Sequence, residues 1–261
     1  MLSEISFEDR RYLYLRELSE IGIKNCFTTK CGGMSKGKIE GLNLGFRVFD
    51  NKDDVLSNYR LVAEDLGFEF GNMVASKQQH TDNIKIITKT DAGKGVTKTS
   101  DISDTDGLVT GEKNIPLVVF SADCFPVLLA DKEKKAVAAV HSGWKGTLLD
   151  ISGKTVEVMK QKFDVRPENI VAAVGAGIGA CCFETKEDVA SKFDKKYIDR
   201  ENNGSYYIDL NRMIKDSLLK RGVLEENVFL SKRCTVCEND LFYSYRSHGD
   251  KTGRMGAIIS L

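Results

Sequence analysis

The sequence predicts an α/β fold of the α+β kind, in which mixed β-sheets pack together and helices flank them. Short apolar runs of strand length recur along the chain, and several follow one another with no helix between them. Helical patterns separate the others at irregular intervals, which fits mixed sheets better than a regular βαβ winding. No internal repeat or Pro/Gly-rich linker divides the 261 residues, so we expect a single domain over residues 1–261.

The N-terminal part is predicted to supply edge elements and one long helix. Residues 1–25 predict edge strands or a short helix, and residues 26–45 predict a short strand followed by a glycine-rich loop. Asp53 or Asp54 is a suitable N-cap for the next helix, and Gly67 ends it. Its buried face is predicted from apolar residues at helical spacing: Val55, Tyr59, Val62, Ala63 and Leu66.

The clearest paired elements are predicted in the middle of the chain. Val127–Ala130 and Ala136–Val140 are apolar runs on either side of a charged turn, Asp131–Lys135. Two such runs joined by a short polar loop predict an antiparallel hairpin. Cys124 precedes the first strand and His141 follows the second, so both would lie at the same open end of the hairpin.

The remaining segments complete the expected layers. Val74–Ile87 predicts two strands around a polar break at Gln78–Asn83, and Thr88–Ser103 predicts a loop. Further helices are expected over residues 147–163, 186–196 and 210–221, the last capped by Asp209. Further strands are expected over residues 170–174, 228–231, 241–245 and 255–260.

Composition excludes several functional classes. Lys plus Arg and Asp plus Glu both number 38, which argues against nonspecific nucleic-acid binding. No apolar run reaches the roughly 18 residues that span a bilayer, and the N-terminus lacks the apolar core of a secretory signal. Seven irregularly spaced cysteines favour reduced thiols over a disulfide framework. We therefore expect a cytoplasmic protein that binds neither nucleic acid nor membrane, as a monomer or homodimer.

The chain has only three histidines, and two of them could join Cys124 in a metal site, although the three residues lie 44 and 17 positions apart and match no short metal motif. His80, Cys124 and His141 together could supply two imidazoles and a thiolate, a ligand set that favours Zn²⁺, with Cu²⁺ possible. Three protein ligands leave one open position, which is typical of catalytic zinc. His248 lies in a glycine-containing polar segment and predicts a surface loop.

The same residues allow interpretations without zinc catalysis. Cys124 could be the nucleophile of a hydrolase or amidase, with His141 as its base. A binding or sensor protein could use the pocket without turnover. A copper polyphenol oxidase is a further alternative, although one cysteine and two histidines cannot supply the several copper sites of a multicopper enzyme.

Other motifs predict structure rather than chemistry. GAGIGA at Gly175–Ala180 matches a loose dinucleotide fingerprint, but no helix pattern follows it. Its glycines more simply let the backbone pass close to the hairpin or to a ligand. Cys234 and Cys237 form a single CxxC pair, which cannot make a zinc site alone, so a structural role is favoured. Cys181 and Cys182 are interpreted as core thiols, with Cys182 able to reach the cavity.

Four cations beside glycine turns or strand ends could converge on an oxyanion. They are Arg60, Lys145, Arg246 and Arg254. Asp123 adjoins the candidate ligand Cys124, and it could orient His80 or His141 or cap a turn.

Several motifs together resemble the YfiH-type family, also called the laccase-domain or multicopper-oxidase-like family. SADCFPVLLAD followed by VAAVHSGWKGT carries the main resemblance. The supporting segments, in family order, are GLNLG, NYRLVAEDLG, the Gln78-Gln79-His80 segment, GAGIGACCFE, CT at Cys234-Thr235, FYSYR and TGR. The resemblance covers nearly the whole chain and implies a YfiH-like fold.

The resemblance also implies an activity. Its members bind zinc through residues that correspond to His80, Cys124 and His141, which would be the catalytic centre. They are purine nucleoside phosphorylases acting on adenosine, inosine and S-methyl-5′-thioadenosine, with adenosine deaminase activity, and some are linked to peptidoglycan-precursor editing. The partners would be a purine nucleoside and phosphate.

The predicted substrate and phosphate contacts follow the family motifs and the cations noted above. They are Asn43, Arg60, Gln78, Lys145 and Arg246. Lys145 stands where many relatives have arginine, which weakens any bidentate phosphate contact there.

Overall fold

The computed structural model describes residues 1–261 and contains two six-stranded sheets and one three-stranded sheet. The first sheet has the order β1 (Ser3–Phe7), β2 (Arg10–Tyr14), β3 (Lys24–Thr28), β15 (Met255–Ser260), β7 (Leu117–Ser121), β4 (Val74–Ala75). The second has the order β14 (Val228–Leu230), β10 (Ile170–Val174), β8 (Phe125–Asp131), β9 (Val137–Ser142), β6 (Gly107–Thr110), β5 (Ile84–Ile86). Both sheets mix parallel and antiparallel pairs, as the fold class predicts.

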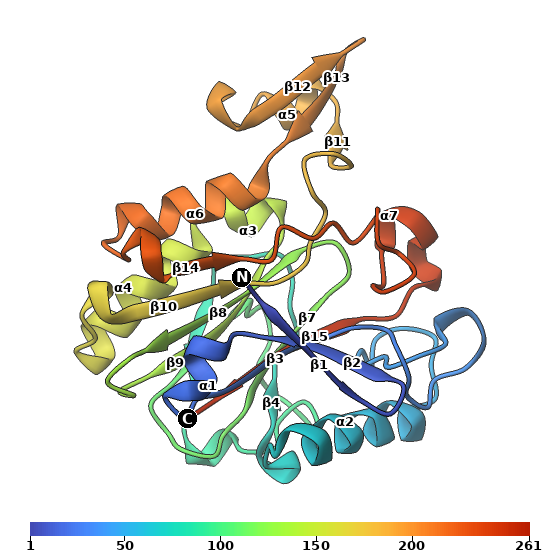
Figure 1. The fold of residues 1–261 in the computed structure, drawn as a ribbon, viewed down its shortest axis with the longest axis vertical. Coiled ribbons are helices and arrows are strands. Elements are labelled where there is room, and N and C mark those ends of the chain that lie inside the picture. Colours follow the sequence, from blue (N-terminus) through green and yellow to red (C-terminus); the bar gives the residue numbers. More distant parts are fainter.

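Helices and a small third sheet surround these two sheets. The helices are α1 (Arg16–Glu20), α2 (Lys52–Leu66), α3 (Trp144–Leu148), α4 (Ile151–Phe163), α5 (Glu187–Ala190), α6 (Leu210–Lys220) and α7 (Tyr245–His248). The third sheet, of order β11 (Glu184–Thr185), β13 (Ser205–Ile208), β12 (Ile198–Asn202), stands out from the main body together with α5 (Figure 1). No helix combines the length and the apolar character needed to cross a membrane.

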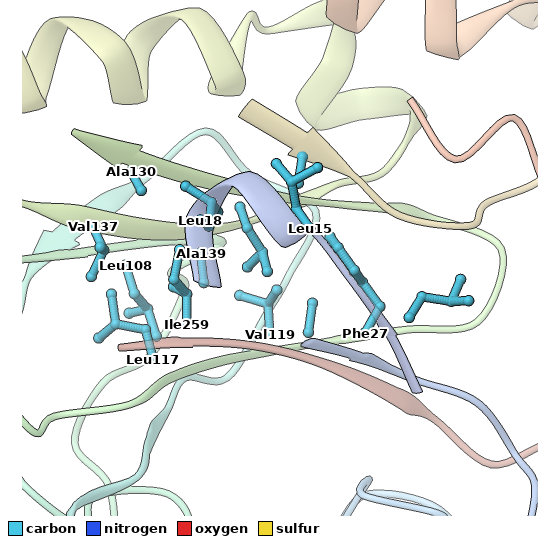
Figure 2. Close-up of a cluster of buried hydrophobic side chains, with 14 of the residues drawn as sticks. Leu15, Leu18, Phe27, Leu108, Leu117, Val119, Ala130, Val137, Ala139 and Ile259 are labelled. Atoms are coloured by element: carbon cyan, nitrogen blue, oxygen red, sulfur yellow. The ribbon is translucent and has the colours of Figure 1, made fainter. Parts of the chain in front are cut away.

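The two large sheets pack face to face over the central core. Leu117, Val119 and Ile259 of the first sheet lie opposite Leu108 and Ala139 of the second, as Figure 2 shows. All of these side chains are buried. Each fully buried aliphatic side chain stabilises the fold by about 1.5–3 kcal/mol relative to exposure.

Helices cover the outer face of each large sheet. α2 packs on the outside of the first sheet through Tyr59 and Val62, and α4 and α6 pack on the outside of the second through Val156 and Ile214. The molecule is therefore layered helix, sheet, sheet, helix (Figure 1). All residues of β8 are buried within this arrangement, and its successive side chains alternate between the two cores.

The hairpin predicted in the middle of the chain is confirmed. β8 and β9 pair antiparallel with Pro126 opposite His141, so Cys124 and His141 lie at the same end. The glycine-rich turn also behaves as expected: a side chain at Gly177 would meet the ring of Phe125 at 2.6 Å. The backbone of this segment therefore passes directly against the hairpin.

Several local predictions were wrong. The N-cap of α2 is Asn51, whose side chain accepts from the backbone N–H of Asp53, rather than Asp53 or Asp54 themselves. The expected helix over residues 147–163 is broken at Asp150, which takes a left-handed φ of 63°. Residues 186–196 form only the short α5 and a 3₁₀ turn, and residues 241–245 form no strand but lead into α7.

Candidate metal centre

Three segments bring the predicted ligands together. His80 lies in the polar break between β4 and β5, Cys124 lies in the turn between β7 and β8, and His141 lies within β9. The Sγ of Cys124 is 3.7 Å from Nε2 of His80, and the two imidazole centroids are 4.9 Å apart. The three ligand atoms all lie within 4.8 Å of one another.

A buried carboxylate that the sequence reasoning missed holds this arrangement. Asp106 is fully buried and accepts a 2.8 Å hydrogen bond from Nδ1 of His141. It also accepts from the backbone N–H groups of Gln79, His80 and Thr81, at 3.1, 3.0 and 2.9 Å. One carboxylate therefore fixes both the ring of His141 and the backbone that carries His80, whose φ is 61°.

The hydrogen bond to Asp106 determines which nitrogen of His141 is available. With Nδ1 engaged by the carboxylate, Nε2 is free to act as a ligand. Burial raises the pKa of Asp106, but His141 and the backbone N–H groups outweigh that effect and hold the pKa well below its usual range. The carboxylate therefore stays ionised and orients the imidazole of His141, the arrangement found behind metal-binding histidines.

Electrostatic coupling makes the thiol easy to ionise. Burial raises the pKa of Cys124, but the opposite effect of His141 and His80 is larger, so that the pKa of the thiol falls to about 6. Burial lowers the pKa of His141, but Cys124 and Asp106 raise it to about 9. The site thus provides a thiolate near neutral pH, which is the form that binds metals.

The donor set and its spacing fit a zinc ion. Tetrahedral zinc with bonds of 2.0–2.3 Å places its nitrogen and sulfur ligands about 3.5 Å apart, close to the separation of Cys124 and His80. Gly143 leaves room beside them, because a Cβ there would lie 2.9 Å from His80 and 3.0 Å from Cys124. The metal ligation predicted for His80, Cys124 and His141 remains a prediction that this geometry supports.

The three residues line a cavity of about 850 Å³. Its apolar wall includes aromatic rings from distant segments, among them Phe120, Trp144, Phe183 and Tyr245. Its polar wall includes the cationic side chains of Arg47, Lys77, Arg246 and Arg254. A cavity of this size accommodates a ligand as large as a nucleoside.

Two of the predicted substrate residues line this cavity. Gln78 exchanges two hydrogen bonds with the backbone of Phe120, 2.7 and 2.9 Å long, and so anchors the segment that carries His80 to β7. Arg246, at the start of α7, donates to the carbonyl oxygens of Cys182 and Glu184.

The structure does not bring three other predicted residues to the cavity. Arg60 is exposed on α2, with its guanidinium 5.1 Å from the centroid of the Phe70 ring. Lys145 is exposed and lies over Trp144 on the outside of α3. Asn43 is fully buried and ties the 43–50 loop together by donating to Asp50 and accepting from Gly45.

Arg254, unlike Arg60, lines the cavity. Its Nη1 donates to the carbonyl oxygens of Thr252 and Gly253, and it forms no ion pair with a carboxylate. Burial lowers the pKa of this guanidinium, although the neighbouring Cys124 and Asp123 raise it. A half-buried guanidinium that lines the cavity and forms no salt bridge is suited to binding an anion.

Asp123 caps a turn and does not orient an imidazole. Its φ is 84°, and its two oxygens accept from the hydroxyl of Thr235 at 2.6 Å and from the backbone N–H of Arg246 at 2.6 Å. It therefore joins the turn that carries Cys124 to two C-terminal segments. His248 is exposed and lies in α7 rather than in the site.

Comparison with known proteins identifies the family. The family model described as "Multi-copper polyphenol oxidoreductase laccase" matches residues 24–261. The chain belongs to this laccase-domain family. Among its relatives, purine nucleoside phosphorylase YlmD of Geobacillus stearothermophilus is 35% identical over 240 residues, covering 89% of this chain and 88% of the relative. A purine nucleoside phosphorylase of Deinococcus radiodurans is 36% identical over 252 residues, covering 95% and 93%.

Solved structures of laccase-domain proteins share the fold. The Bacillus licheniformis hypothetical protein YfiH superposes with a TM-score of 0.90 at 32% identity, covering 96% of each chain. YlmD of Geobacillus stearothermophilus superposes with a TM-score of 0.90 at 33% identity, covering 95% of each chain. The YfiH-like fold predicted from the motifs is therefore confirmed.

Proposed function

We propose that this protein is a zinc-dependent purine nucleoside phosphorylase. The observation that carries the proposal is one cavity that combines a two-histidine, one-cysteine centre, aromatic walls and an unpaired half-buried guanidinium. The similarity to relatives named purine nucleoside phosphorylase supports the same substrate class. The two substrates would be a purine nucleoside, such as adenosine or inosine, and inorganic phosphate.

The aromatic wall supplies a binding surface for the base. Phe120, Trp144 and Phe183 are partly or fully buried around the cavity, and Tyr245 is half exposed at its edge. A purine placed against such rings gains stacking and apolar burial with little dependence on its substituents. This wall therefore accepts adenosine, inosine and S-methyl-5′-thioadenosine alike.

The cationic wall supplies the phosphate site. Arg254, with Arg47 and Arg246 on the same cavity, would hold phosphate against the anomeric carbon of the nucleoside. A phosphate oxygen forms a bond to C1′ while the C1′–N9 bond breaks and its electron pair leaves with the purine. The proton lost by the phosphate monoanion ends on the purine, so ribose 1-phosphate and free base are formed.

The metal site contributes polarisation. Zinc held by His80, Cys124 and His141 would act as a Lewis acid toward a substrate oxygen or nitrogen. Asp106 keeps His141 in the tautomer that this requires. Deamination of adenosine at C6 is the second reaction that such a centre could support.

All seven cysteines are free thiols, which favours a cytoplasmic location.

The test is an assay of adenosine with and without phosphate. The zinc-loaded protein is expected to form adenine and ribose 1-phosphate only when phosphate is present. Cys124→Ala should lower kcat/KM about a thousandfold, the several kcal/mol expected of a lost Lewis acid. Cys31→Ala, a half-buried thiol outside the site, is the matched control. Full phosphorolysis by a zinc-free Cys124→Ala protein would overturn the proposal.

A metal-free Cys–His hydrolase or amidase is the second candidate, and one observation favours it. Cys124, His141 and Asp106 form the order of nucleophile, base and orienting carboxylate that thiol hydrolases use. This candidate requires amide hydrolysis by zinc-free protein and its loss on alkylation of Cys124. Peptidoglycan precursors are amide substrates to include.

A copper polyphenol oxidase is the least supported alternative. The chain has three histidines, and only two of them reach the cavity. Several copper centres cannot be built from these residues. Oxygen consumption with a phenol substrate by copper-loaded protein would be needed to support it.

A further inference from the structure

Four cysteines gather at a second place, outside the catalytic cavity. Cys181 and Cys182 follow the glycine turn after β10, and Cys234 and Cys237 lie between β14 and α7. Their sulfur atoms all lie within 4.8 Å of one another. The Sγ of Cys237 is 3.6 Å from that of Cys181 and 3.5 Å from that of Cys182. The prediction that Cys181 and Cys182 are core thiols was wrong, because Cys181 is exposed and Cys182 is half-buried, and Cys182 does not line the cavity.

We propose that Cys181, Cys182, Cys234 and Cys237 bind a structural zinc ion in a four-thiolate site. Tetrahedral zinc with four sulfur ligands at about 2.3 Å places those sulfurs about 3.8 Å apart. The separations in this cluster match that spacing. Four protein ligands would close the coordination sphere, so this metal would have no position for substrate.

The backbone around the cluster is arranged for thiolates. The N–H of Gly179 donates to the Sγ of Cys234 at 3.3 Å. A side chain at Gly179 would crowd the cluster, since its Cβ would lie 3.2 Å from the Sγ of Cys181. Donors directed at sulfur and free space beside it are features that a metal–thiolate site needs.

Nearby cations compensate the charge that such a site would carry. Zinc with four thiolates has a net charge of −2. Arg246 donates to the carbonyl of Cys182 at 3.0 Å, and Arg200 donates to the carbonyl of Cys181 at 3.4 Å. Two guanidinium groups therefore already lie against the ligand segment, which lowers the cost of placing that charge there.

The position of the cluster gives the metal a structural consequence. It joins the base of the three-stranded sheet to the segment that leads into α7 (Figure 1). Thr235 lies inside the Cys234–Cys237 loop and donates to Asp123, which immediately precedes the catalytic ligand Cys124. A metal here would therefore brace the turn that carries Cys124 without touching the substrate.

Zinc stoichiometry tests the proposal independently of any catalytic activity. Reduced protein dialysed with zinc and freed of excess metal is expected to hold two zinc ions per chain. Cys181→Ser/Cys237→Ser, which changes the two exposed thiols, should hold one, and Cys124→Ser should also hold one. Cys31→Ser, outside both clusters, should hold two. A single zinc that is lost entirely in Cys124→Ser would overturn the second site.

Alkylation of the wild-type chain gives the same answer if the variants fold poorly. Zinc is expected to protect all four cluster cysteines from iodoacetamide, and a chelator should restore their reactivity, as mapped by mass spectrometry. Equal labelling with and without zinc, or a disulfide within the cluster under reducing conditions, would contradict the proposal. Because no turnover is measured, failure of the proposed phosphorolysis would leave this result unaffected.

Discussion

The two sulfur-containing clusters differ in what surrounds them. The His80, Cys124 and His141 cluster offers three candidate ligands, opens onto the 850 Å³ cavity and is oriented by the buried Asp106. The four-cysteine cluster offers four candidate ligands, lies in loops and lines no part of that cavity. Three protein ligands facing a cavity are typical of a catalytic zinc site, whereas four protein ligands are typical of a structural zinc site.

The clusters are nevertheless connected through one side chain. Thr235 belongs to the four-cysteine loop, and its hydroxyl holds Asp123 beside Cys124. Because Asp123 adopts a left-handed φ of 84°, its turn needs such external support. Structural order at one cluster therefore contributes to ligand placement at the other.

Asp106→Asn is expected to have the largest effect in this comparison, because it should lower the zinc affinity of only one of the two clusters. The asparagine loses one acceptor oxygen, so the ring of His141 and the backbone of His80 and Thr81 are no longer all held. Removing the carboxylate behind a metal-binding histidine lowers metal affinity by about 10–100-fold. Zinc titration should show this loss for one site per chain, and the four-cysteine site should keep its affinity.

Asp91→Asn is the matched control for that experiment. Asp91 is a similarly buried carboxylate, but it pairs with Lys94 and touches neither cluster. It should lower stability without changing either zinc affinity. If Asp106→Asn binds both zinc ions as tightly as the wild type, the orienting role assigned to Asp106 is wrong.

The sequence predicted the elements that follow local rules. The β8–β9 hairpin, α2 and β15 each carry an uninterrupted apolar pattern, and the structure has each of them. The failures occurred where tertiary contacts outweigh propensity. Asp150 interrupts the periodic helix with a left-handed φ, and its carboxylate pairs with Ser217 of α6 and with Arg221, the C-cap of α6.

The candidate site was predicted in part. His80, Cys124 and His141 stood out because the chain contains so few histidines. Asp106 was missed because its function depends on strand pairing: β6 pairs with β9 and places the carboxylate beside His141. The sequence did contain a signal for Asp106. This carboxylate directly precedes the strand Gly107–Thr110, and polar residues at strand ends often face a site.

The four-cysteine cluster could not be predicted from spacing. Cys181 and Cys237 are 56 positions apart, and no sequence pattern predicts that β10 and β14 are neighbouring strands. Their parallel pairing in the second sheet is what brings the two segments together. Metal sites assembled from separate loops become visible only once the topology is known.

After Asp106→Asn, the next largest effect is expected for Arg254→Gln, on the KM for phosphate. The substitution keeps much of the side-chain length but removes the unpaired charge that faces the cavity. A charge-assisted hydrogen bond contributes about 1.5–3 kcal/mol, so the KM for phosphate should rise at least about tenfold. The KM for adenosine and both zinc affinities should stay near their wild-type values in steady-state assays and zinc titrations.

Arg254→Lys tests whether charge alone is sufficient. Lysine keeps the charge but not the planar donor fork, so it should recover only part of the phosphate affinity. An unchanged phosphate KM in Arg254→Gln would show that the anion binds elsewhere on the cationic wall.

Arg60→Gln and Lys145→Gln are expected to have the smallest effects. Both side chains lie outside the cavity, over the rings of Phe70 and Trp144, at 5.1 and 5.5 Å from the ring centroids. Losing an exposed cation–π contact costs about 0.5–1 kcal/mol of stability, and the phosphate KM should change by less than about twofold. Thermal unfolding and steady-state kinetics measure the two quantities separately. A tenfold rise in phosphate KM for Arg60→Gln would mean that α2 moves toward the cavity when substrate binds, since nothing in the present geometry lets that guanidinium reach it.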